Sequence, residues 1–378
     1  MTESPSHPDR HRPVDGPTVS FAFNLGKIPE HGEDSDPILR EGPDLALLAV
    51  FDGMGGAGGT VYETPDGPRS GAYLASRIAR DVVERRMLDL LVPDWNLNGA
   101  DAAEDLRRSV QAALEARLLE LKAPVSRLRS KLLRALPTTM AVLALQRGSR
   151  AGSTWLCHVF WAGDSRGYVF TPDGAHQLTV DDLREPSDAM ANLRKDSVVS
   201  NAVSADTEFR VNYRRVELEA PFLLVCATDG CFGYLPTPMH FEQLVVRSLV
   251  ESRDVDAWSR AIQAEVAAVA GDDAAMAVTG VGADLTELQA LYAPRQTELQ
   301  EQFTGPIDHL HEEVQQAEQE LVRQRQRQTA ETQRLWSSYQ PRYERYLHPA
   351  PDAASPSPAE PDGAGAHAAV EVASEVPS

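Results

Sequence analysis

Short apolar runs, separated by polar and turn-forming residues, fill the middle of the chain. They are rich in Val, Phe and Leu, which favour strands that pack against a core, and their lengths suit strands better than helices. Pro172-Asp173-Gly174 marks a clear turn after one of them, Tyr168-Val169-Phe170. We therefore predict β-strands at residues 19–24, 45–51, 139–145, 155–162, 166–171, 209–218, 222–227 and 275–281.

Apolar residues recur with helical spacing between these strands. The longest helical pattern is broken near Pro124, because proline disrupts a helix interior. We predict helices at residues 71–91, 102–136, 241–250 and 255–269. Strands and helices come in groups, without the one-to-one alternation of βαβ units. The pattern thus predicts an α+β fold in which helices cover sheets, rather than a doubly wound parallel sheet.

Composition divides the chain into four predicted parts. Residues 1–17 are polar and rich in proline, which indicates a flexible N-terminus, and residues 18–283 have the pattern of a globular domain. Residues 284–347 form a helical, coiled-coil-like extension. Residues 348–378 contain Pro, Ala, Ser, Glu and Gly with almost no large apolar side chain, which predicts a disordered tail.

The extension carries an apolar stripe whose partner the sequence leaves open. Its members recur at alternating spacings of three and four residues: Ile307, Leu310, Val314, Ala317 and Leu321. Beyond Leu321 the stripe becomes polar, so the heptad pattern is too brief to decide between two interpretations. One is a helix that is solvated or packs on its own domain. The other is a helix that binds a partner or a second copy of the chain.

Charge and cysteine content narrow the class of protein. The 378 residues include 56 acidic and 36 basic ones, a net charge of −20, which argues against nucleic acid and anionic membrane as partners. No apolar run resembles a signal peptide or reaches the roughly 20 residues of a membrane span. The three cysteines lack metal-ligand spacing and indicate reduced thiols. We therefore predict a cytoplasmic protein.

Candidate chemistry lies in four short acidic stretches. Asp34 ends the run His31-Gly32-Glu33-Asp34, Asp52 and Asp229 each follow an apolar strand, and Asp272-Asp273 open the last one. Carboxylates are costly to crowd together unless positive charge lies between them. Hard divalent cations prefer oxygen ligands of this kind. The pattern thus predicts a site for a pair of such cations.

Together these stretches resemble the metal-dependent protein phosphatases of type 2C, the PPM family. The resemblance rests on five motifs that occur in the family's order within residues 18–283. They are Asp52-Gly53-Met54-Gly55-Gly56, Thr138-Thr139-Met140-Ala141, Gly163-Asp164-Ser165-Arg166, Thr228-Asp229-Gly230 and Gly271-Asp272-Asp273-Ala274. One Asp-Gly pair alone would indicate only a turn after a strand. Five motifs in order are a specific signal.

The resemblance implies two stacked antiparallel sheets with helices on both outer faces, an α/β/β/α sandwich. It also implies a phosphoserine/phosphothreonine phosphatase that uses water activated by two Mn²⁺ or Mg²⁺ ions. Asp52 would bridge both ions and act catalytically with Asp34, which binds or orients metal water. The metal ligands that it implies are Glu33, Asp34, Asp52, the Gly53 carbonyl, Asp229 and Asp272, while Asp273 hydrogen-bonds to the ligands.

A third ion would be held by Asp181 or, alternatively, by Asp182, although this segment could also be a simple helix cap. Asp164 is interpreted as structural, fixing the turn between two strands by side-chain hydrogen bonds. The family often binds phosphate with an arginine five residues before the position of Asp34, which is Pro29 here. Lys27 lies nearby and is the candidate phosphate-binding residue, although it could be a surface lysine.

Two functions from different classes fit this sequence. The first is an active phosphatase whose phosphoprotein substrates are targets of bacterial-type serine/threonine kinases. The alternative is a weakly active or inactive regulatory or scaffold protein that binds a partner through its C-terminal helix. Retention of the acidic residues favours the enzyme, because an inactive copy would have no reason to bear their mutual repulsion. The substitution at Pro29, and Pro137 where the family usually has glycine, keep the alternative open.

Overall fold

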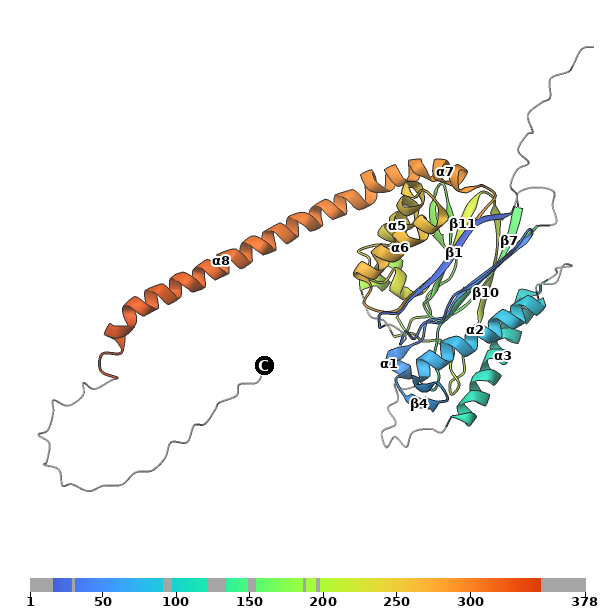
Figure 1. Cartoon of the computed structure of the whole chain (residues 1–378), viewed down its shortest axis with the longest axis horizontal. Helices are drawn as coiled ribbons and strands as arrows, with labels where there is room; N and C mark the ends of the chain where they lie inside the picture. Colours follow the sequence, from blue (N-terminus) through green and yellow to red (C-terminus); the bar gives the residue numbers. More distant parts are fainter. Residues whose placement is uncertain are drawn as a thin grey trace, which may run out of the picture. The chain divides into compact units, whose positions relative to one another are not determined.

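In the part of the chain before α8 (Gly305–Tyr343), two five-stranded antiparallel sheets form the middle layers (Figure 1). The computed structural model describes residues 16–28, 31–90, 97–121, 134–148, 154–185, 188–194 and 198–347. The first sheet has the order β1 (Pro17–Leu25), β12 (Ala274–Val281), β11 (Phe222–Ala227), β8 (Arg166–Thr171) and β9 (Gly174–Gln177). The second has the order β10 (Asn212–Glu219), β7 (Thr154–Ala162), β6 (Met140–Arg147), β3 (Leu45–Val50) and β2 (Ile38–Gly42).

Strand β3 shows why the predicted strands are apolar along their whole length. Its Leu48 packs between the two sheets, in the same apolar cluster as Leu224 of β11. Its Leu47 points the other way and packs with Ala79 under the helices. Because both faces of each sheet are buried, the central strands carry apolar residues at consecutive positions instead of alternating with polar ones.

Helices cover both outer faces (Figure 1). The second sheet packs against α2 (Gly71–Leu90) and α3 (Gly99–Glu120). The first sheet packs against α5 (Pro238–Glu251), α6 (Val255–Val269) and α7 (Leu285–Glu298). Short elements complete this part: α1 (Gly55–Gly58), the hairpin β4 (Val61–Thr64) and β5 (Gly67–Ser70), α4 (Ala189–Arg194), and a 3₁₀ turn, η1 (Asp229–Cys231). The predicted α/β/β/α sandwich is confirmed.

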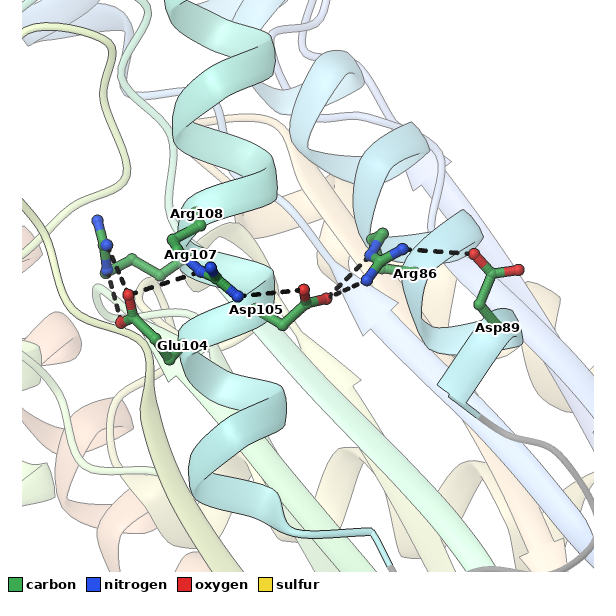
Figure 2. A network of polar contacts seen from close by, with 6 residues as sticks. All are labelled: Arg86, Asp89, Glu104, Asp105, Arg107 and Arg108. Atoms are coloured by element: carbon green, nitrogen blue, oxygen red, sulfur yellow. Dashed lines mark hydrogen bonds and ion pairs between the residues drawn. The ribbon is translucent and has the colours of Figure 1, made fainter.

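Charged side chains join α2 to α3 on the outer surface (Figure 2). The Arg86 guanidinium donates from Nε and Nη2 to Oδ2 of Asp105, at 2.9 and 2.7 Å. Pairs such as Arg107–Glu104, at 2.7 Å, run along α3 itself. Exposed pairs of this kind each contribute only about 0–1 kcal/mol, so the apolar contacts beneath them dominate the helix packing.

The C-terminal region begins as part of the same body. Tyr292 of α7 is fully buried and its hydroxyl donates to the Phe170 carbonyl at 2.6 Å. After the π-helical turn η2 (Leu299–Thr304) comes α8 (Gly305–Tyr343), which has no buried residue. The chain divides into two compact units, Met1–Asp308 and His309–Ser378. The predicted tail 348–378 and most of the predicted N-terminus 1–17 lie outside the described residues, and the four-part division stays a prediction.

No helix in the described part of the chain is both long enough and apolar enough to cross a membrane.

Candidate functional site

Four carboxyl groups, one buried and three half-buried, come together near the strand ends. Asp52 follows β3, and burial raises its pKa well above the usual value. The charges of Asp229, Asp34 and Asp164 then raise it further, in that order, followed by Asp272. Such mutual effects require these groups to lie near one another. The structure thus brings together residues that are far apart in the sequence.

Asp34 is the most deeply held of these groups. It is 1% exposed, and its Oδ2 accepts a hydrogen bond from the Thr228 hydroxyl at 2.8 Å. Burial raises the pKa of Asp34 to about 8, against the lowering effect of this hydrogen bond, and the charges of Asp229 and Asp273 add to the rise. The Thr228 hydroxyl also accepts from the Ala275 backbone N–H at 2.8 Å, so Asp34 is fixed to the sheet next to Asp229.

Asp229 begins the 3₁₀ turn that follows β11. Burial raises its pKa to about 6, and the neighbouring Asp272 adds to the rise. The next residue has to be glycine, because a Cβ on Gly230 would lie 1.9 Å from the Asp273 carbonyl oxygen. The close approach of this turn to β12 places Asp229 beside the acidic pair that precedes the strand.

Asp273 ties the loop of residues 26–34 to this edge of the sheet. Its Oδ1 accepts from the Lys27 backbone N–H at 2.7 Å, and its Oδ2 accepts from the Glu33 backbone N–H at 2.5 Å. The Lys27 ammonium donates to the Gly271 carbonyl. The side chain of Lys27 is exposed, but this hydrogen bond holds it close to Asp272 and Asp273. Its role in phosphate binding stays a prediction.

Glu33 approaches the cluster from the N-terminal loop. Its Oε1 accepts a hydrogen bond from the Ser70 hydroxyl at 2.5 Å, just before α2 begins. Burial raises the pKa of Glu33, and the charges of Asp273 and Asp272 contribute. A Cβ at Gly53 would lie 2.5 Å from the Glu33 carbonyl oxygen, so only glycine lets the segment after Asp52 lie against this loop.

Arg77 of α2 holds this loop from the other side, and the sequence analysis did not identify it. Its guanidinium donates to the carbonyls of Gly32 and Glu33, at 3.1 and 3.3 Å. It also stacks on the Tyr73 ring, with Cζ 3.5 Å from the ring centroid. Burial lowers the pKa of Arg77, but a guanidinium stays charged in proteins. The side chain therefore positions the Glu33 backbone and supplies a nearby positive charge.

Arg77→Met should weaken divalent-cation binding without unfolding the protein. It keeps the apolar stem but removes the donor to the Gly32 carbonyl, which costs about 1–3 kcal/mol if that oxygen stays dry. The Glu33 carbonyl keeps its hydrogen bond from the Ser76 hydroxyl. We expect about a tenfold weaker apparent Mn²⁺ affinity by calorimetry and a lower melting temperature. Arg85→Met is the matched control, because Arg85 is exposed on the same helix and its Nε donates to the Asp81 carbonyl. Equal Mn²⁺ affinity in both variants would contradict the positioning role.

A cavity of about 220 Å³ opens beside the cluster, lined by both Asp164 and Asp181. Asp181 is engaged there: Arg166 Nη2 lies 2.6 Å from its Oδ2, and both side chains are 4% exposed. Gln177 and Asn192 also donate to its carboxylate, at 3.1 and 2.9 Å. Asp181 as a metal ligand therefore stays a prediction, in which the ion would compete with Arg166.

The structure assigns the turn-fixing role to Asp182 instead of Asp164. Asp182 Oδ2 accepts from the Gly163 backbone N–H at 3.2 Å and from the Asn212 amide at 2.8 Å. Asp164 faces the cavity, and burial raises its pKa to about 7, with Asp229 and then Asp181 adding to the rise. The interpretation of Asp164 as a purely structural turn residue therefore does not fit its surroundings.

The donor set fits hard divalent cations. Among the described residues, no three acidic, histidine or cysteine side chains form a metal-binding group as they stand. Asp34 is nevertheless buried, and Asp52, Asp164 and Asp229 are half-buried. Burial, and then the charges of neighbouring carboxyls, raise the pKa values of all four. Carboxylate oxygens crowded in this way suit Mg²⁺ or Mn²⁺, which would neutralise them.

A family model described as protein phosphatase 2C matches residues 34–269 of the chain. No curated protein matches the chain. Similar solved structures include the serine/threonine phosphatase PstP/Ppp of Mycobacterium tuberculosis, 14% identical, with a TM-score of 0.49, over 71% of this chain and 100% of that one. The catalytic domain of the serine/threonine phosphatase PstP in complex with two manganese ions is 16% identical, with a TM-score of 0.44, over 70% and 99%.

A C. elegans sex-determining protein is 16% identical, with a TM-score of 0.50, over 73% of this chain and 67% of that one. At this identity the likeness concerns the fold alone.

Proposed function

Because the chain belongs to the protein phosphatase 2C family, we propose that it is a divalent-metal-dependent phosphatase that hydrolyses phosphoserine and phosphothreonine in proteins. The observation that carries this proposal is the cluster of partly buried, mutually repelling carboxyls around Asp52. Such a cluster weakens the fold unless cations neutralise it, so its presence argues for a metal-binding role.

We assign the residues of the cluster to two ions. Asp52 would be the ligand shared by the ions. The Gly53 carbonyl, Glu33, Asp229 and Asp272 would supply the further oxygen ligands. Asp34 is proposed to orient a metal-bound water, because its carboxyl is buried and held by a hydrogen bond from the Thr228 hydroxyl. Mn²⁺ or Mg²⁺ is the proposed metal, since both accept carboxylate and carbonyl oxygen.

The bound ions would activate a water for attack on phosphorus and offset the charge of the phosphoryl oxygens. The residues of the chain have two further tasks. The Thr228 hydroxyl holds the Asp34 carboxylate in a fixed orientation, so that it can position a water near the ions. Asp273 and Arg77 fix the backbone of the loop that carries Glu33, so that the ligands are set before substrate arrives.

For a third ion, we propose Asp164 together with Asp229 ahead of the predicted Asp181. Asp164 lines the cavity and interacts with the charge of Asp229, whereas Asp181 already pairs with Arg166. If an ion does reach Asp181, Arg166 has to turn away first.

The test is hydrolysis of p-nitrophenyl phosphate and of a phosphothreonine peptide by the full chain, with added Mn²⁺ or with EDTA. We expect turnover with Mn²⁺ and loss of turnover with EDTA. No turnover on either substrate, in a protein whose melting temperature Mn²⁺ still raises, would favour the regulatory or scaffold alternative over the enzyme.

Lys27→Ala should raise KM for a phosphopeptide more than it lowers kcat. A cation that holds the phosphate equally in substrate and transition state contributes uniform binding, which appears in KM alone. The ammonium must leave the Gly271 carbonyl to do this. The measurement is a full kinetic curve for wild type, Lys27→Ala and Lys27→Arg. Unchanged KM and kcat in the alanine variant would show that Lys27 is only a surface residue.

We propose phosphoproteins as the substrates, most naturally the targets of bacterial-type serine/threonine kinases, and a cytoplasmic location. The three cysteines support that location, because Cys157, Cys226 and Cys231 are all buried free thiols rather than disulfides.

A further inference from the structure

Helix α8 has an apolar stripe that no other described part of the chain buries. None of its 39 residues is buried, although Leu310 (60%), Val314 (55%) and Leu321 (50%) lie exposed on the stripe. Leu335, 53% exposed, continues the same spacing two heptads after Leu321. Most helical stability in proteins comes from packing of an apolar face rather than from helix propensity. This helix therefore needs a partner for that face.

Charge along α8 is divided between its two halves. From Gly305 to Val322 there are five acidic residues and no Lys or Arg: Asp308, Glu312, Glu313, Glu318 and Glu320. From Arg323 to Tyr343 there are five arginines and a single acidic residue, Glu331: the arginines are Arg323, Arg325, Arg327, Arg334 and Arg342. The helix is thus negative in its first half and positive in its second.

Few of the arginines of α8 form ion pairs within the helix. Arg323 pairs with Glu320 at 3.7 Å across the boundary, and Arg334 pairs with Glu331 at 2.6 Å. In the part of the chain that the structure describes, Arg325 and Arg327 form no ion pair. Most of the positive half therefore remains open to a partner.

We propose that α8 pairs with α8 of a second copy of this chain, in antiparallel orientation. The antiparallel arrangement sets the negative half of each helix beside the positive half of the other, twice by symmetry. A parallel pair would set like charges beside each other along its whole length. In this arrangement Leu310 of one copy lies near Leu335 of the other. The remaining apolar positions Val314, Ala317 and Leu321 then face the polar seam positions Glu331, Gln328 and Gln324, so the charges rather than the stripe set the orientation. Gln324 and Gln328 fall at polar positions of this seam, which limit register at some cost in stability.

This inference does not depend on the catalytic proposal, because it uses only the second half of the chain. Its first test is the molar mass of the full chain by light scattering across a range of concentrations and salt. We expect a dimer at low salt that weakens as salt screens the charges. A monomer at tens of micromolar protein, or a trimer or tetramer, would overturn the proposal.

Charge reversal tests the pairing itself. One variant carries Glu312→Lys, Glu313→Lys, Glu318→Lys and Glu320→Lys. A second carries Arg323→Glu, Arg325→Glu, Arg327→Glu and Arg334→Glu. Each alone should be a monomer, while an equimolar mixture, and a chain carrying all eight changes, should be dimers. Lys, Glu and Arg have similar helix propensities, so circular dichroism should show the helix retained once paired. Failure of the eightfold variant to dimerise would overturn the charge argument.

Crosslinking then distinguishes the two orientations. Leu310→Cys and Leu335→Cys chains, made with different tags, are mixed and treated with a flexible bismaleimide. The native thiols should not react, because all three are buried and burial raises their pKa values. We expect the mixed 310–335 product to dominate. Predominance of the 310–310 product would show a parallel pair and overturn the proposal. Phosphatase activity should be unchanged throughout, since no α8 residue is assigned to the active site.

Discussion

Asp52→Asn is expected to lower phosphopeptide turnover by more than the roughly 10- to 100-fold that loss of an outer-shell partner of a metal typically causes. Asparagine keeps the size and one oxygen of the side chain but removes the charge that we propose to bridge two cations. Its neighbours Asp229 and Asp34 would then face the ions without a shared ligand. The measurement is kcat for a phosphothreonine peptide at saturating Mn²⁺.

The melting temperature of Asp52→Asn shows whether the variant has lost its metal site or its fold. Repulsion from Asp229 and Asp34 raises the pKa of Asp52, after burial itself. Removing its charge should therefore leave the metal-free melting temperature equal or higher at pH 8. The rise in melting temperature that Mn²⁺ gives the wild type should shrink or vanish, since a ligand stabilises only as far as it binds the folded state.

Asp44→Asn is the matched control, because Asp44 immediately precedes the strand that Asp52 follows. Its side chain is 70% exposed and pairs with Arg147, an interaction worth about 0–1 kcal/mol at the surface. Wild-type turnover and a wild-type Mn²⁺ effect are expected. Equal activity of Asp52→Asn and the control in Mn²⁺ would remove Asp52 from the metal centre.

The central strands could be predicted because they are buried on both faces, so the apolar signal is continuous. The strands that the sequence analysis missed, β2, β4, β5 and β9, are short and contain charged residues or glycine. β2 and β9 lie at sheet edges and β4 pairs only with β5, so few neighbours demand apolar residues there. α3 ends at Glu120, where Leu121 leaves the helical conformation with an extended backbone. Residues 122–133 of the predicted helix 102–136 lie outside the described residues.

The site residues that lie in sequence motifs could be predicted, whereas those that depend on contacts between distant parts of the chain could not. Asp52 and Asp229 could be identified because each follows an apolar strand within a recognisable motif. Arg77 could not, since its partners are backbone carbonyls 44 and 45 positions away, which leave no mark in the sequence. Asp164 lies near Asp229 because β8 pairs with β11, with Arg166 opposite Ala227. That register follows from packing of the whole sheet, and spacing along the chain does not reveal it.

The metal-free protein is expected to lose stability as pH rises from about 5 to 8. The ordinary pKa of an aspartate is 3.8, whereas the folded protein holds Asp229 at about 6, Asp164 at about 7 and Asp34 at about 8. A carboxyl with a raised folded-state pKa binds more protons when folded than when unfolded. The free energy of unfolding therefore falls as pH rises from near 4 to the folded-state pKa.

Each unit of pKa difference corresponds to about 1.4 kcal/mol, so the metal-free protein should lose several kcal/mol across this window. In a domain of this size that lowers the melting temperature by about 5–15 °C. The measurement is calorimetry in EDTA at pH 5.5 and 8, repeated with Mn²⁺, which should restore more stability at the higher pH because it binds the ionised carboxylates.

Asp34→Asn tests whether the cluster is the cause. This variant lacks the group with the pKa of about 8, so its metal-free melting temperature should fall less between pH 5.5 and 8 than that of the wild type. Asp44→Asn, which changes an exposed carboxyl, should keep the full wild-type fall. A wild-type melting temperature in EDTA that stays level or rises over this range would mean that the buried carboxyls do not repel one another. The main reason for placing two cations between them would then be gone.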